Sequence, residues 1–190
     1  MRNSLYLVDL NSLTDIFKDI YQPLLKYTEI QSLLKQVDVS TDKNFQKKFT
    51  NFYRMKQRNK YFYEFYFTLF EFLKNKQPTF EYIITQIYEN TGRVDPSAAS
   101  KMLSSIDTGY PIWDKHLLEK LCLSQPRLYW KKEHRLTESI QIYIIIEERF
   151  EFMVNSLRGR KLINLFDEKF SFSGLTKIKK IEFILSNVKE

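Results

Sequence analysis

The sequence is poor in the residues that form disulfides, metal clusters and long loops. Its 190 residues include one cysteine, four glycines, five prolines and two histidines. The single cysteine, Cys122, excludes an internal disulfide and a four-cysteine zinc or iron–sulfur site within one chain. It also favours an intracellular, cytoplasmic location. The scarcity of glycine and proline leaves little room for long loops or disorder.

Several signals of location and chemistry are also missing. Polar residues interrupt the first fifteen positions at Asp9, Asn11 and Asp15, so we expect no secretory signal. No apolar run approaches the roughly 18 residues of a membrane span, so we expect no membrane association. The sequence has no GxxxxGK[ST] loop, GxGxxG turn or HExxH pair, and His116 and His134 lack the spacing of metal ligands. We therefore expect no metal and no cofactor.

The sequence does have many apolar and positively charged side chains. Hydrophobic residues make up 43%, aromatic residues make up 16%, and the formal net charge is +7 at pH 7. The length and the helical spacing of apolar residues predict one compact all-α domain, with lobes at residues 1–75 and 76–190. The positive charge favours a polyanionic partner such as a nucleic acid. A protein partner and the oligomeric state are left open.

Apolar periodicity and capping residues divide the chain into expected helices. Pro23 is expected to split the first helical region, residues 12–36, into two helices. A helix–hairpin–helix is expected from the turn at Gly92 between residues 79–90 and 95–106. Further helices are expected at 115–121, at 137–157 with an end near Gly159, at 161–170 and at 176–186. Residues 61–73 carry aromatic side chains on every face, which is more typical of a buried central helix than of a base-stacking platform.

Two stretches are rich in positive charge. Residues 43–60 contain no acid, and their aromatic residues Phe45, Phe49, Phe52 and Tyr53 fall on one face of a helix. The basic side of this amphipathic helix either is simply solvated or faces phosphates. The candidate DNA contacts in this stretch are Lys43, Lys47, Lys48, Arg54, Lys56, Arg58 and Lys60. A loop at residues 124–135 adds Arg127, Lys131, Lys132 and Arg135.

The candidate reactive pair is Lys101 and Asp114. Asp95 and Pro96 predict the start of a helix that carries Lys101 near its beginning, where the positive end of the helix would lower the pKa of the amine. A neutral lysine can attack a sugar carbon and form a Schiff base, and a nearby aspartate can stabilise the charge that develops there. Alternatively, Lys101 is a solvated helix residue and Asp114 only caps the next helix.

The order Pro96, Ser97, Ala98, Ala99, Ser100, Lys101, followed by a proline and Asp114, resembles the helix–hairpin–helix DNA glycosylase superfamily, in particular its 8-oxoguanine branch. Serine and alanine replace the two glycines of that hairpin. The resemblance implies double-stranded DNA as the partner, two helical lobes around a cleft, Lys101 and Asp114 as catalytic residues, and a target base flipped out of the duplex. It further implies that the hairpin residues Ser97, Ala99 and Ser100 grip a DNA phosphate.

Two more residues are candidates for a base pocket. Trp113 either stacks on the flipped base or belongs to the core, and His116 either approaches the same cleft or lies on a helix surface. The C-terminal run from Phe166 to Ile184, with Lys177, Lys179 and Lys180, also resembles small uncharacterised bacterial and phage proteins that share the segment Pro111–Asp114, and this likeness implies no activity. Three hypotheses follow: a base-excision glycosylase with lyase activity, a non-catalytic DNA-binding module, and a protein-interaction factor with a basic surface.

Overall fold

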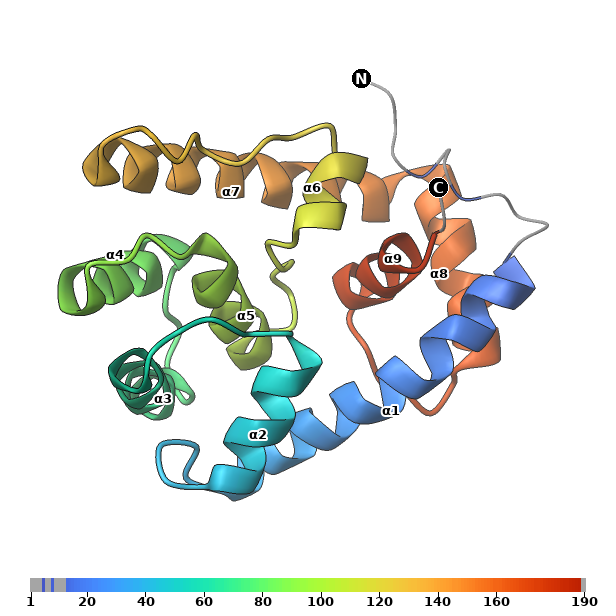
Figure 1. Cartoon of the computed structure of the whole chain (residues 1–190). Coiled ribbons are helices and arrows are strands. Elements are labelled where there is room, and N and C mark those ends of the chain that lie inside the picture. Colours follow the sequence, from blue (N-terminus) through green and yellow to red (C-terminus); the bar gives the residue numbers. More distant parts are fainter. Residues whose placement is uncertain (1–4, 6–7, 9–12, 189–190) are drawn as a thin grey trace.

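The computed structural model is all-α (Figure 1) and describes residues 5, 8 and 13–188. Within these residues it contains nine helices and no strand. The helices are α1 (Leu13–Gln36), α2 (Lys43–Phe52), α3 (Lys60–Leu73), α4 (Phe80–Thr91), α5 (Pro96–Ile106), α6 (Lys115–Lys120), α7 (Lys132–Asn155), α8 (Leu157–Lys169) and α9 (Lys177–Ser186). In the same part of the chain, no helix combines the length and the apolar character that crossing a bilayer requires.

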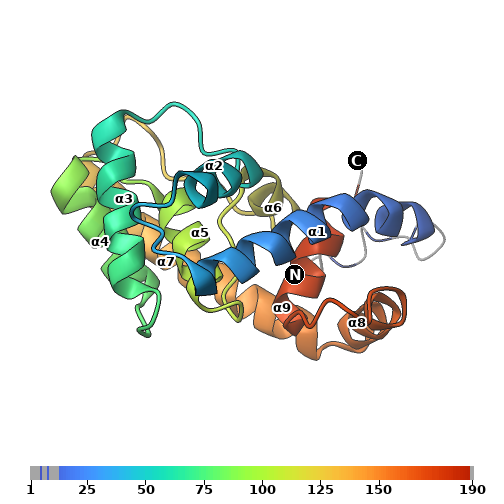
Figure 2. The same cartoon turned by 90° about the horizontal axis from the view of Figure 1, so that it is seen from below.

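Two long helices connect the ends of the molecule. Helices α3, α4 and α5 gather at one end and α8 and α9 at the other, while α7 runs along both and packs against α4, α8 and α9. Figure 2 shows α1 crossing from the α8–α9 end to the α2–α3 end. Buried apolar side chains from all nine helices form one hydrophobic cluster. Because α1 packs on α9 and α3 on α4, contacts cross the expected boundary at residues 75 and 76, and the division into two lobes stays a prediction.

Polar side chains at helix starts explain much of this architecture. In seven of the helices the residue before the first turn accepts a hydrogen bond from a backbone N–H of that turn, and these residues are Asp42, Asn59, Thr79, Asp95, Asp114, Ser156 and Thr176. The α4–α5 hairpin turns at Gly92, whose φ of 66° suits glycine best. The expected helix–hairpin–helix is therefore confirmed as local structure.

Three expectations about helix boundaries are wrong. Pro23 lies inside α1 and does not split it, because eight buried apolar side chains along the helix offset the roughly 3 kcal/mol that an internal proline costs. The basic stretch 43–60 is not one helix, since α2 ends at Phe52 and α3 begins at Lys60. The loop expected at residues 124–135 is shorter, because α7 already begins at Lys132. The end of α7 at Asn155 lies close to Gly159, as expected, and Gly159 itself lies in the first turn of α8, where an added Cβ would sit 1.8 Å from the carbonyl oxygen of Met153.

The aromatic helix α3 is buried on one face only. Phe62, Tyr66 and Phe70 are fully buried and pack into a group of rings with Phe49 of α2. The opposite face is open, and Phe72 remains 58% exposed. The expectation of a buried helix holds for the first face, which anchors the α2 segment beside the candidate site.

Candidate functional site

A pocket of about 400 Å³ lies where α1, α2, α5, α9 and the segment before α6 meet. Both candidate residues, Lys101 and Asp114, line it. Exposed Lys26, Arg54 and His116 also line it and form its rim, so the pocket is open to solvent. The two residues that the sequence singled out therefore line the same open pocket. They lie thirteen positions apart in the sequence, Lys101 on α5 and Asp114 directly before α6.

Lys101 is buried in the middle of α5. Its side chain projects from the sixth residue of the helix, only 6% of the residue is exposed, and Nζ donates a hydrogen bond of 2.9 Å to the carbonyl of Tyr53. Burial lowers the pKa of Lys101 to about 8, while the negative charge of Asp114 opposes this change. The expectation that the helix N-terminus depresses this pKa is therefore corrected, since loss of water around the amine has the larger effect.

Asp114 caps α6 at the edge of the pocket. Its Oδ1 accepts a hydrogen bond of 3.0 Å from the backbone N–H of His116, and its side chain is half-buried. The carboxylate raises the pKa of the Lys101 amine, so the two groups interact electrostatically. One carboxylate oxygen serves the cap, and the other has no hydrogen-bond partner within the described residues, which leaves it available to a ligand.

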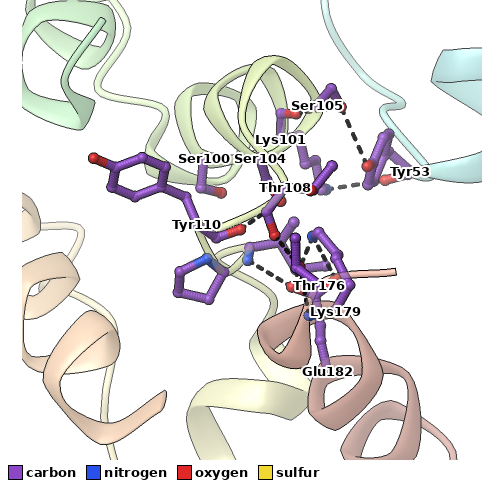
Figure 3. A network of polar contacts seen from close by, with 12 residues as sticks. Tyr53, Ser100, Lys101, Ser104, Ser105, Thr108, Tyr110, Thr176, Lys179 and Glu182 are labelled. Carbon is purple, nitrogen blue, oxygen red and sulfur yellow. Dashed lines mark hydrogen bonds and ion pairs between the residues drawn. The ribbon is translucent and has the colours of Figure 1, made fainter. Parts of the chain in front are cut away.

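Side chains from neighbouring elements hold the irregular segment before α6. Thr176 Oγ1 donates to Thr108 O, Ser104 Oγ donates to Tyr110 O, and Glu182 Oε2 accepts from Ile112 N (Figure 3). In addition, Tyr143 Oη donates to Pro111 O, and Ser100 Oγ accepts from Trp113 N. These side chains come from α5, α7, α9 and the residue before α9. The segment that carries Asp114 is thus fixed without belonging to a helix or strand.

The sequence analysis missed a buried ion pair on α9. Lys179 is fully buried, and its Nζ lies 2.8 Å and 2.9 Å from the two carboxylate oxygens of Glu182. Burial lowers the pKa of Lys179, and the Glu182 charge opposes this change. Glu182 also lines the pocket and accepts the Ile112 amide. The spacing of three residues would have suggested the ion pair, but the sequence gives no sign that it is buried.

The hairpin residues do not have the expected exposure. Ala99 and Ser100 are fully buried, and the backbone N–H of Ala99 already donates to Asp95 O. We therefore correct their assignment as phosphate contacts: α5 is a central helix, and its small side chains allow close packing. Ser97 is half-buried and lines a second pocket of about 220 Å³ with Arg93 and Arg135.

The base-pocket candidates are also separated. Trp113 is 1% exposed and does not line the pocket that holds Lys101, so the alternative of a core tryptophan is the one that the structure supports. His116 is exposed at the rim of that pocket, and its Nδ1 lies 3.5 Å from Glu119. In place of the tryptophan, the aromatic walls of the pocket come from Tyr27, Phe52 and Phe183.

The predicted DNA-contacting cations fall into two groups. Arg58 is not available, because its guanidinium forms a bidentate ion pair with Asp95 at 2.7 Å and 3.0 Å and is 11% exposed. Five of the predicted cations are exposed, and their side chains have no hydrogen bond or ion pair to other described residues. These five are Lys47, Arg54, Lys56, Lys131 and Lys132. Four others have partners within the chain: Lys43 with Gln46, Lys48 with Glu29, Lys60 with Glu64, and Arg127 with Tyr129. Arg135 is half-buried, and its Nε is buried without a hydrogen-bond partner within the described residues.

Burial of Lys101 makes the stability of the fold depend on pH. Its pKa of about 8 in the folded chain lies below the ordinary 10.5, so between these values the unfolded chain binds more protons and stability rises with pH. Between pH 7 and pH 9.5 we expect the wild type to gain about 2 kcal/mol relative to Lys101→Met. Urea unfolding followed by circular dichroism measures this difference, and parallel pH profiles of the two chains would contradict it.

Scans against protein-family models, curated protein sequences and solved structures found no match to this chain. The function proposed below therefore depends on the chemistry and geometry of the pocket.

Proposed function

We propose that the chain binds double-stranded DNA and acts as a base-excision glycosylase with lyase activity. Lys101 is the nucleophile in this proposal, and Asp114 is the assisting acid–base or charge-stabilising residue. One observation supports the proposal above the others. An amine with a pKa lowered to about 8 and a half-buried carboxylate line the same open pocket. Perturbed groups that converge on a cleft are typical of catalytic sites.

The chemistry uses the lone pair of the neutral amine. With a pKa of about 8, roughly a tenth of the Lys101 side chains are neutral at pH 7 and half at pH 8. Nζ attacks C1′ of the deoxyribose, the C1′–N bond breaks, and the base leaves with that electron pair and takes up a proton. The Nζ–C1′ adduct then loses a proton and its sugar ring opens, which gives a Schiff base. The Asp114 carboxylate stabilises the positive charge that develops at C1′.

The cations around the pocket fit a DNA backbone. Arg54 comes directly after Tyr53, whose carbonyl accepts the hydrogen bond from Lys101 Nζ. The φ of Arg54 is 49°, in the left-handed region, which is uncommon for arginine. Lys26 of α1, which also lines the pocket, was not among the predicted DNA contacts. Both side chains are exposed at the rim, together with Asn51. Exposed cations at the rim of a pocket give the electrostatic attraction that phosphates require.

A second candidate function is a DNA-binding module without catalysis. The hydrogen bond from Lys101 Nζ to Tyr53 O favours this candidate. Tyr53 is the C-cap of α2, and a lysine side chain can bind the free carbonyls at the C-terminal end of a helix. In this alternative Lys101 holds the end of α2 in place, and the exposed cations bind DNA or an acidic protein surface.

Borohydride trapping separates the two candidates. We expect a covalent complex on at least one duplex among those that contain 8-oxoguanine, uracil or an abasic site. Its rate of formation should rise about tenfold per pH unit up to about pH 8 and then level off. Failure on every duplex together with salt-sensitive binding supports the non-catalytic module. Absence of DNA binding at low salt rejects both candidates as DNA-binding proteins and leaves binding to an acidic protein surface.

A further inference from the structure

Two backbone amides directly before Asp114 are held by buried side chains. Trp113 N donates to Ser100 Oγ at 2.8 Å, and Ile112 N donates to Glu182 Oε2 at 3.0 Å. Ser100 is fully buried and Glu182 is 7% exposed, so neither bond competes with bulk water. A backbone amide buried in this way needs a partner, but a partner from any direction would suffice. The hydrogen bond to Ser100 therefore fixes where the Trp113 amide lies relative to α5.

Ser100 and Trp113 are each the residue immediately before a candidate reactive residue. The bond between them joins α5, one position before Lys101, to the irregular segment, one position before Asp114. The Ser100 hydroxyl also donates to Ser97 O at 3.1 Å, which fixes its rotamer and directs an oxygen lone pair at Trp113. Figure 3 shows Ser100 and Ser104 on the side of α5 that faces this segment. The bond thus sets how the amine and the carboxylate lie relative to each other.

We propose that Ser100 is a positioning residue, whose hydroxyl sets the position of the Asp114 carboxylate relative to the Lys101 amine through the Trp113 amide. The catalytic meaning of this positioning depends on the proposed function, whereas the positioning itself does not. A serine that only satisfied a buried amide would contribute to stability and would leave the Lys101–Asp114 interaction unchanged.

The charges around Lys101 allow the two roles to be distinguished. Asp114 and Asp95 raise the pKa of its amine, and Arg58 lowers it. Asp95 and Arg58 are locked to each other by a bidentate ion pair, while Asp114 sits on the segment that Ser100 holds. The other charged groups that face the pocket are Lys26, Arg54, His116 and Glu182, none of which Ser100 contacts. Loss of the Ser100 hydroxyl should therefore act on Lys101 through Asp114.

The test measures the ionisation of Lys101 in the full chain without DNA. Acetic anhydride labels neutral amines, and peptide mass spectrometry reports the labelling of Lys101 as a function of pH. We expect a midpoint near pH 8 for the wild type. In Ser100→Ala the midpoint should fall by about 0.5 pH unit as Asp114 moves away. The matched control is Ser104→Ala, which loses a comparable hydroxyl bond to Tyr110 O, four residues before Asp114, and should leave the midpoint unchanged.

A double variant tests the route of the effect. Asp114→Asn should lower the midpoint by itself, and adding Ser100→Ala to it should cause no further shift. Equal midpoints in Ser100→Ala and Ser104→Ala would overturn the proposal, as would a Ser100→Ala shift that persists without the Asp114 charge. If Ser100→Ala does not fold, Ser100→Cys keeps the volume, weakens the acceptor and carries the same expectation.

The outcome is separable from the fate of the proposed function. A midpoint shift in a chain that never traps on DNA keeps Ser100 as the residue that sets the Lys101–Asp114 geometry and rejects the enzyme. Trapping by the wild type with no midpoint shift in the variants keeps the enzyme and rejects the role of Ser100.

Discussion

Lys101→Gln is expected to reduce covalent trapping by borohydride about 10³-fold or more on any duplex that the wild type traps. Glutamine has a similar length and can keep a donor near Tyr53 O, which Lys101 Nζ binds at 2.9 Å. It has no lone pair able to attack C1′, because the amide nitrogen is conjugated to its carbonyl. Binding of DNA should change by only a few-fold, since a buried amine contributes little to contacts with phosphates. Gel-resolved covalent complex and an equilibrium binding titration measure the two effects.

Lys26→Gln is the matched control for this experiment. Lys26 lines the same pocket from α1 but is exposed, whereas Lys101 is buried. Trapping by Lys26→Gln should stay within a few-fold of the wild type at saturating DNA. If Lys26→Gln loses trapping while Lys101→Gln keeps it, the nucleophile has been assigned to the wrong lysine.

The buried ion pair on α9 gives the largest expected effect on stability. Lys179→Met removes the cation and leaves the Glu182 carboxylate without its charged partner, 7% exposed and held by the Ile112 amide. Leaving a buried charge uncompensated typically costs about 3–5 kcal/mol. We expect a loss of this size in the free energy of unfolding at pH 7, measured by urea denaturation.

The double variant Lys179→Met/Glu182→Gln should recover most of that loss. Glutamine keeps an oxygen for the Ile112 N–H, and the double variant has no unpaired charge. The neighbouring Lys180 provides a surface control, because its ion pair with Asp167 is half-open, with the aspartate side chain 46% exposed. Lys180→Met should cost about 1 kcal/mol or less. A Lys179→Met chain as stable as Lys180→Met would show that the α9 pair does not contribute as its burial indicates.

Local features of the fold were predictable because they depend on neighbouring residues. Thr79, Asp95 and Asp114 were expected to start helices, and the structure confirms all three as caps. Helix interruptions were less predictable. Pro23 stays inside α1 because the buried side chains of that helix outweigh its local preference.

The candidate site was predictable in part for the same reason. Lys101 and Asp114 share a pocket because the segment after α5 brings Asp114 back beside that helix. The short connection between the two residues favoured this proximity. The depth of Lys101 was not predictable, since it depends on Tyr53 and the rest of α2 covering the amine. The pairing of Arg58 with Asp95 joins residues 37 positions apart, and a basic run gives no sign that one of its members is buried.

The walls of the pocket include side chains from α1 and α9, which are far apart in the sequence. Tyr27 of α1 packs against Phe183 of α9, with ring centroids 5.6 Å apart, and the two residues are more than 150 positions apart in the sequence. Contacts of such high sequence separation form late, since the loop that they close is long. During synthesis, Ile112 would therefore wait for Glu182 to emerge before its amide is paired. The site is completed only when α9 docks, so its formation reports that the whole chain has folded.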